Sequence, residues 1–147
     1  MRTTAAFLGI AAGIILGATP VFAWGPQGHQ IIAHIAARHP TPSARAQAGA
    51  LLGGETEAMM VLYSTWADEV RADRPETASW HFVNIELGSR GYQASRDCPD
   101  SACVVAQIAR DEKILADPKA PGRAEALRFL IHLAGDIHQP LHVSDNQ

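Results

Sequence analysis

The sequence predicts an all-α protein, folded as a bundle of several helices. Several stretches carry apolar residues three and four positions apart, the spacing of one helix face. Proline and glycine separate these stretches at positions where helices begin and end. The one β-prone run, residues 80–85, lies within a Pro-, Gly-, Ser- and Asp-rich segment, residues 75–100, where we expect a loop or an extended chain. A hydrophobic content of 47% and a charged content of 18% are typical of one globular domain.

The first 23 residues have the composition of a secretory signal peptide. Arg2 is their only charged residue, residues 5–18 are apolar, and Val21 and Ala23 put small residues at positions −3 and −1 of a cleavage site. The longer stretch from Thr3 to Ala23 is nearly long enough to span a bilayer, so a retained anchor is the alternative. No basic cluster follows the run, which favours the signal peptide and a secreted or periplasmic protein.

Cleavage after residue 23 would leave residues 24–147, which we expect to form part of a single domain. This stretch has 11 basic and 15 acidic residues, a net charge of −4 with His neutral. No general positive field therefore attracts a polyanion, and any phosphate must be bound locally by metal ions or a few arginines. We expect no membrane association after cleavage and no obligate protein partner.

Three helices are expected in the first half of this domain. The first follows the sequence WGP, contains the helix-forming residues 31–37 and stops at His39-Pro40. The second spans Pro42 to Leu52 and ends at two glycines. The third spans residues 57–71, because large apolar side chains recur there at steps of three and four: Met59, Leu62, Tyr63, Trp66 and Val70.

Two further helices are expected after the loop-like segment. One spans about residues 102–115 and ends before Asp117-Pro118. The last spans about residues 123–137 and ends before Pro140. It is apolar on most sides, so we expect it to be central and buried.

Cys98 and Cys103, the only cysteines, lie close together in the sequence CPDSAC. An oxidising compartment favours a disulfide bond that closes this small loop. Two free thiols or a pair of metal ligands are the alternatives, although the spacing fits no common zinc motif.

The last helix carries a candidate metal site. His132 and Asp136 are spaced i and i+4, so both side chains project from one face of an apolar helix, where they need partners. His142 follows just beyond the helix end, which gives three nitrogen or oxygen donors from two directions, as a metal cage requires. The alternative is a hydrogen-bonded core histidine beside an aspartate that pairs with an arginine.

Four other residues add donors to this candidate site. Asp68 and His81 are each flanked by large apolar residues, and His29 opens the first helix, where it can face the new N-terminus. If cleavage exposes Trp24, its free α-amine and its carbonyl oxygen can close a five-membered chelate ring on one metal ion. The alternative is that Trp24 packs only as a hydrophobic residue.

Five sequence patterns, in this order, resemble the zinc-dependent single-strand nucleases of the S1/P1 type, which are related in fold to bacterial zinc phospholipases C. The patterns are WGPQGH at 24–29, WADEVR at 66–71, WHFVNI at 80–85, the cysteine pair followed by VVAQI, and HLAGDIHQPLH at 132–142. The resemblance covers the whole chain after the signal peptide and implies a phospholipase C/nuclease-like helical bundle.

The resemblance also implies three zinc sites. The first would be held by Asp68, His81, His132 and Asp136. The second would be held by the amine and carbonyl of Trp24, by His29 and by the shared Asp136. Asp68 and Asp136 would be the catalytic carboxylates, and His142 would begin a third site that in the family takes a later His and Asp. Because the sequence ends at Gln147, we expect a truncated domain, an incomplete third site and impaired activity.

The substrate implied is single-stranded DNA or RNA, cleaved at phosphodiester bonds to 5′-phosphate products; 3′-nucleotidase activity is left open. Phe82 would stack on a nucleobase, and Asn84 stands where family members commonly carry an acidic residue. A zinc phospholipase C is the alternative enzyme, although the short gap from Trp24 to His29 and the presence of Phe82 favour the nuclease. A non-catalytic zinc-binding helical fragment is the alternative outside enzymes.

The expected role of Trp24 depends on a free amino group at that residue. Adding one alanine between the signal peptide and Trp24 is predicted to remove one zinc ion per chain, because the amine becomes part of a peptide bond. Zinc content of the purified protein, normalised to that of the correctly cleaved form, measures this loss. Unchanged zinc content and activity in the extended protein would refute the prediction.

Overall fold

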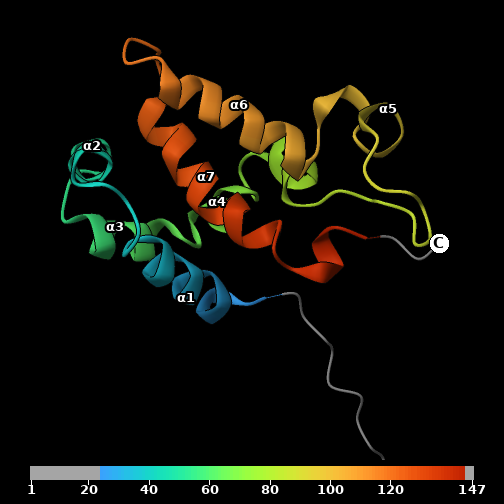
Figure 1. The fold of residues 1–147 in the computed structure, drawn as a ribbon, viewed down its shortest axis with the longest axis horizontal. Coiled ribbons are helices and arrows are strands. Elements are labelled where there is room, and N and C mark those ends of the chain that lie inside the picture. Colours follow the sequence, from blue (N-terminus) through green and yellow to red (C-terminus); the bar gives the residue numbers. More distant parts are fainter. Residues whose placement is uncertain (1–23, 145–147) are drawn as a thin grey trace, which may run out of the picture.

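A computed structural model describes residues 24–144. The expected signal peptide, residues 1–23, and the last three residues, 145–147, lie outside the described residues. Between residues 24 and 144 the chain forms seven α-helices and three short 3-10 helices, and this stretch contains no β-strand (Figure 1). The expected all-α fold is therefore confirmed.

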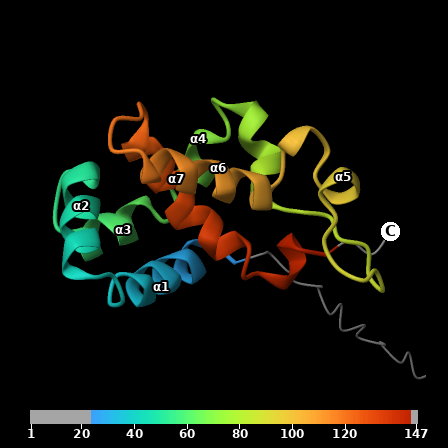
Figure 2. The same cartoon turned by 45° about the horizontal axis from the view of Figure 1, so that its top comes forward.

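Helix α7 (Arg123–Asp136) lies at the centre of the described fold. Figures 1 and 2 show α6 (Val104–Ala116) running beside it, with α1 (Pro26–Ala36), α2 (Pro42–Leu52) and α3 (Thr56–Tyr63) grouped on the other side. All four of these helices contact α7. The expectation of a central, buried last helix is therefore correct.

Two hydrophobic clusters pack against opposite sides of α7. The larger one includes Phe129 and Leu133 of α7, and it joins that helix to Val104 of α6 and to Val83. The smaller one includes Ile131 of α7 and joins it to α1, α2 and α3; its other buried members are Ala33 and Leu52. The position of α7 is thus fixed from both sides by apolar burial.

The second helix begins and ends where the sequence predicts. The Thr41 side chain accepts a hydrogen bond from the backbone N–H of Ala44 at 3.2 Å, and Pro42 occupies the first helical turn. Gly53 ends the helix with a φ of 82°, which glycine adopts without steric cost. Local capping signals were sufficient here because they agree with the tertiary packing.

The single helix predicted over residues 57–71 is wrong. The structure divides it into α3 and α4 (Trp66–Val70), with a break at Ser64 and Thr65. The Ser64 hydroxyl donates a hydrogen bond to the carbonyl of Val61 at 2.8 Å, and the break leaves the carbonyl of Ser64 free to accept from His132. The apolar periodicity continues across the break because both helices pack against α7, so the pattern alone does not reveal it.

The segment predicted as a loop contains three short helical elements: η1 (Pro75–His81), α5 (Ala94–Asp97) and η2 (Pro99–Ser101). Residues 80 and 81 therefore end a 3-10 helix, and residues 82–85 have no regular secondary structure, with an extended backbone at Phe82. Cys98 and Cys103 form the expected disulfide bond, so the alternatives of free thiols and a metal pair are excluded.

Among the described helices, none has the length and apolar character needed to cross a membrane.

Asp111 on α6 is a buried carboxyl group with 4% of its surface exposed. Burial raises its pKa to about 7; the charge of Arg110 opposes this shift, and the charge of Glu125 adds to it. The folded-state pKa thus exceeds the ordinary value of 3.8 for an aspartate. Any stability that the protonated carboxyl contributes is present below pH ~4 and is lost as the pH rises through ~7.

Replacing Asp111 by Asn is predicted to stabilise the protein at pH 8.5 by a few kcal/mol, on the order of 1.36 kcal/mol per unit of pKa shift, and to have little effect at pH 4. Urea unfolding at both pH values measures the difference. Glu112→Gln, an exposed neighbour on the same helix, is the matched control and should leave the pH profile unchanged. Identical pH profiles for Asp111→Asn and the unmodified protein would contradict this account.

Candidate metal centre

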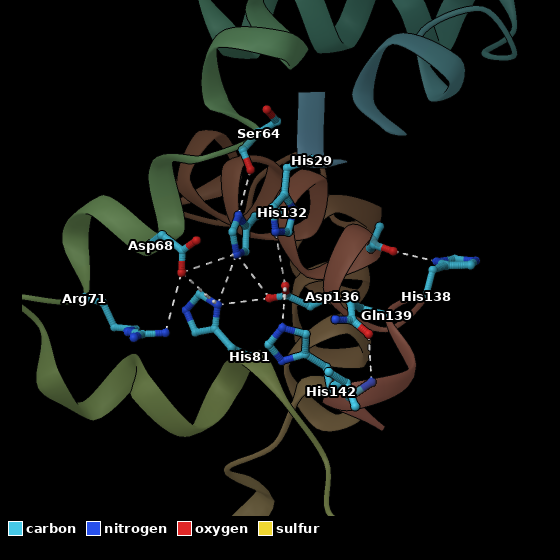
Figure 3. A network of polar contacts seen from close by, with 12 residues as sticks. His29, Ser64, Asp68, Arg71, His81, His132, Asp136, His138, Gln139 and His142 are labelled. Carbon is cyan, nitrogen blue, oxygen red and sulfur yellow. Dashed lines mark hydrogen bonds and ion pairs between the residues drawn. The ribbon is translucent and has the colours of Figure 1, made fainter. Parts of the chain in front are cut away.

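Side chains from four elements meet near the C-terminal end of α7 (Figure 3). His132 and Asp136 come from α7, and they are joined by His29 of α1, Asp68 of α4 and His81 at the end of η1. Four of these side chains are at most 3% exposed, whereas Asp68 is about half exposed. The cluster is therefore buried but reaches solvent on the side of Asp68.

The orientation of His132 is set by the break between α3 and α4. Its Nδ1 lies 2.7 Å from the carbonyl oxygen of Ser64, which is fully buried. A carbonyl can only accept, so Nδ1 carries the proton and Nε2 faces the cluster with a free lone pair when the ring is neutral. This is the tautomer that ligation through Nε2 requires.

Three candidate ligand atoms lie about 3 Å from one another, and a fourth, from Asp68, lies slightly farther from two of them. His81 Nδ1 lies 3.0 Å from Asp136 Oδ2 and 3.1 Å from His132 Nε2, and His132 Nε2 lies 3.1 Å from Asp136 Oδ2. Asp68 Oδ1 lies 3.7 Å and 3.8 Å from the two histidine nitrogens. Ligand atoms about 2.0–2.1 Å from a tetrahedral Zn²⁺ would lie roughly 3.3 Å apart, so the donor set fits such an ion.

The charges of this group also fit a cation. Burial disfavours the charged form of Asp136, but hydrogen bonds from His132 and His81 and their charges outweigh burial and hold its pKa well below its usual range. For His132, burial lowers the pKa most strongly, yet the hydrogen bond to Asp136 and the nearby carboxylates raise it overall. Asp136 therefore remains an anion in the interior and needs positive charge beside it.

The second oxygen of Asp136 faces a different pair of histidines. Asp136 Oδ1 lies 3.4 Å from His29 Nε2 and 3.9 Å from His142 Nε2. Burial lowers the pKa of His29, so its ring is neutral and suited to ligation. The two oxygens of one carboxylate thus point to two groups of donors, as a bridging metal ligand requires.

The remaining predicted site residues are Phe82, Asn84, Trp24 and His142. Phe82 and Asn84 are exposed on the segment that follows His81. Trp24 is 37% exposed and its side chain packs against Gly28 in the first turn of α1. His142 ends the short helix η3 (Pro140–His142), and its carbonyl accepts a hydrogen bond from the N–H of Val83 at 2.8 Å.

Sequence reasoning missed two contacts of the site. The carbonyl of Ser64, which orients His132, has no sequence signal, because every residue carries a carbonyl. Arg71 places Nη1 3.5 Å from Asp68 Oδ1, an i,i+3 pair that the spacing within WADEVR could have indicated. Both side chains of that pair are about half exposed, so it contributes little to stability.

The fold and this cluster define a class: an all-α protein with a candidate metal centre on its central helix. A model of the family described as S1/P1 Nuclease matches residues 24–147. The chain belongs to the S1/P1 nuclease family, as the sequence patterns indicated.

Three relatives show how far the similarity extends. The chain is 34% identical over 126 residues to "Nuclease P1" of Penicillium citrinum, covering 81% of this chain and 47% of the relative. It is 31% identical to "Nuclease S1" of Aspergillus oryzae, covering 92% and 49%. It is also 31% identical to "Endonuclease 2" of Arabidopsis thaliana, covering 92% and 50%. The chain thus spans about half the length of these relatives.

Zn²⁺ is predicted to raise the melting temperature of the protein, because it neutralises the buried carboxylate. At about 100 times its dissociation constant a ligand stabilises by about 2.7 kcal/mol, or roughly 10 °C for a domain of this size. His81→Ala should lose most of this shift. His34→Ala, which replaces a half-exposed histidine paired with Glu57, is the control and should keep it.

Scanning calorimetry with Zn²⁺ and with a chelator measures both melting temperatures. Equal zinc-induced shifts in His81→Ala and His34→Ala would show that the ion binds outside the cluster around Asp136.

Proposed function

We propose that this chain is the metal-binding part of a zinc-dependent nuclease that hydrolyses phosphodiester bonds of single-stranded DNA or RNA to 5′-phosphate products. The observation that carries the proposal is the buried carboxylate of Asp136, whose two oxygens face separate groups of donors. The relatives are named as nucleases and endonucleases, which supports the substrate class.

Zinc is the proposed metal because of the types of donor. Asp68, His81, His132 and Asp136 offer two imidazole nitrogens and two carboxylate oxygens at separations suited to a tetrahedral ion. Softer Cys ligands take no part, since the two cysteines are bonded to each other. Magnesium and calcium prefer an oxygen-only set, so the two histidines argue against them.

A second and a third ion would extend this first site. Asp136 Oδ1, His29 and the amine and carbonyl of Trp24 would hold the second ion, with the amine freed by signal-peptide cleavage. His142 would be one ligand of the third. It lies within 3.9 Å of Asp136 and is about one-fifth exposed, so it stands at the rim of the buried cluster.

When bound, the zinc ions supply a water of lowered pKa and positive charge for the transition state at phosphorus. The residues of the chain provide the surroundings for this chemistry. Asp136 would be a ligand to both ions, and the carbonyl of Ser64 keeps His132 in the ligating tautomer. The half-exposed side of Asp68 leaves a route by which a phosphodiester can reach the site.

Phe82 supports a single-stranded substrate. Its ring is 37% exposed and directly follows the candidate ligand His81. An exposed aromatic ring can stack on an unpaired base, whereas the bases of a duplex are already stacked on each other. The formal net charge of −3 gives no general attraction for polyanions, so local stacking and the metal ions would provide the affinity.

We also propose that the protein is exported to the periplasm or the outside of the cell. The composition of residues 1–23 supports this, and so does the disulfide bond, which persists in oxidising compartments. The proposal includes neither an obligate protein partner nor membrane attachment after the signal peptide is cleaved.

The zinc-loaded protein is predicted to cleave denatured DNA to 5′-phosphate ends and to lose this activity with a chelator. Asp136→Asn should reduce kcat/KM at least about 1000-fold, because it removes the ligand shared by two ions. Gel assays measure cleavage of single-stranded and duplex DNA, and end-group analysis identifies the new ends. A hydrolysis assay with phosphatidylcholine tests the alternative substrate class.

Glu125→Gln, a half-exposed carboxylate on the same helix, is the matched control and should retain activity. Cleavage of phosphatidylcholine alone would identify a phospholipase C instead. Tight zinc binding without cleavage of any substrate would identify a non-catalytic zinc-binding protein.

A further inference from the structure

A glycine in α7 lies directly beneath one of the candidate ligands. A Cβ atom on Gly135 would lie 2.6 Å from Nδ1 and 3.1 Å from Cε1 of His29. The His29 ring is 3% exposed, and Nδ1 has no hydrogen-bond partner among the described residues. The ring of His29 therefore rests on the bare backbone of α7, one residue before Asp136.

The same ring is confined on its face. It stacks on the ring of His132, with centroids 4.0 Å apart and an angle of 12° between planes. His132 is fully buried and hydrogen-bonded to Ser64, so it cannot move aside easily. Any side chain at residue 135 would therefore displace His29, and with it the Nε2 that lies 3.4 Å from Asp136 Oδ1.

A second glycine makes a similar close approach at the start of α1. A Cβ atom on Gly28 would lie 2.8 Å from Cβ and 3.2 Å from Cγ of Trp24. At Gly25 the nearest atom to an added Cβ lies 3.6 Å away, which is an ordinary contact. Gly28 is thus the position that lets residue 24 fold back against the helix carrying His29.

Helix stability gives no reason for glycine at either position. Both residues lie in α-helices, and neither has a positive φ. Glycine within a helix costs about 1 kcal/mol relative to alanine, so local stability alone favours alanine at both positions. The two close approaches involve Trp24 and His29, the two residues proposed to hold the second zinc ion together with Asp136.

We propose that Gly28 and Gly135 are positioning residues for the second zinc site. Gly135 lets the His29 ring lie close enough to α7 for its Nε2 to share an ion with Asp136. Gly28 lets Trp24 lie against the first turn of α1, the helix that carries His29. The amine of Trp24 and the ring of His29 can then approach the ion from one element. This inference rests on the proposed function, in which Trp24 and His29 are ligands.

The alanine variants are expected to weaken the second ion selectively. In Gly135→Ala the His29 ring must move by about 0.8 Å to reach the 3.4 Å of an ordinary contact. Loss of ligand positioning typically lowers metal affinity about 10–100-fold. Asp68, His81 and His132 lie outside the two close approaches, so the first ion should keep its affinity.

The test uses the full chain, expressed with its own leader, exported, and confirmed by mass spectrometry to begin at Trp24. Competition with a chromophoric chelator gives the zinc affinity of each site, and elemental analysis gives the stoichiometry. Gly28→Ala and Gly135→Ala should each lose 10–100-fold in affinity for one ion. Gly25→Ala, the matched control, should bind zinc as the unmodified chain does.

A double-mutant cycle separates positioning from a general structural effect. In a His29→Ala background, Gly135→Ala should cause no further loss of zinc affinity, because its effect acts through the missing ring. An equal loss in both backgrounds would overturn the inference. If circular dichroism shows that Gly135→Ala does not fold, Gly28→Ala decides, and unchanged affinity for the second ion in that variant would overturn the inference.

Failure of the proposed function gives a different result. An unmodified chain that starts at Trp24 and binds only one zinc ion would overturn the second site, and this inference with it. Two ions in the unmodified chain and undiminished affinity in both alanine variants would overturn the positioning role alone.

Discussion

The buried carboxylate of Asp136 is the constraint on which the rest of the structure depends. It is the last residue of α7, where the partial negative charge of the helix C-terminus disfavours an anion. It is also 2% exposed, so water cannot solvate it. Both effects call for positive charge or donors from several directions. The fold supplies four histidines around its two oxygens, from α1, η1, α7 and η3.

The hydrophobic core keeps these histidines in place by fixing the elements that carry them. Phe82 and Val83, directly after His81, are tied by backbone hydrogen bonds to Val104 of α6 and to His142. Val104 follows Cys103, whose disulfide bond belongs to the same buried cluster as Phe129 and Leu133. One continuous apolar cluster therefore supports both the segment after His81 and the central helix.

Features encoded by local chemistry were predictable from the sequence. The bounds of α2 followed from Pro42 and the two glycines at its end, and the i,i+4 spacing of His132 and Asp136 placed both on one face of the last helix. Tertiary features were not predictable. The break at Ser64 interrupts a helix whose apolar pattern continues. The carbonyl that it exposes contacts a residue 68 positions away, and no local sequence signal indicates such a contact. The close approach at Gly135 likewise involves a ring from the other end of the chain.

The expectation that Asp68, His81 and His132 lie close together rested on the order of motifs in a known family and not on their spacing. Residues 68, 81 and 132 are too far apart in the sequence for any local rule to bring them together. Helical periodicity predicts which face of each helix is buried, but it does not state which helices meet. For this reason the resemblance was more informative about the site than about the helix bounds.

The two sides of Asp136 differ in how firmly their donors are held. On the Oδ2 side, His81 and His132 are at most 1% exposed, and His132 is fixed by Ser64. On the Oδ1 side, the His29 ring is buried and stacks on His132, but His142 lies beyond the end of α7 and is 20% exposed. Donors that are held rigidly before binding lose less conformational entropy when an ion arrives. The Oδ2 side is therefore the better-organised half of the centre, and the organisation of the Oδ1 side depends on how closely α1 packs against α7.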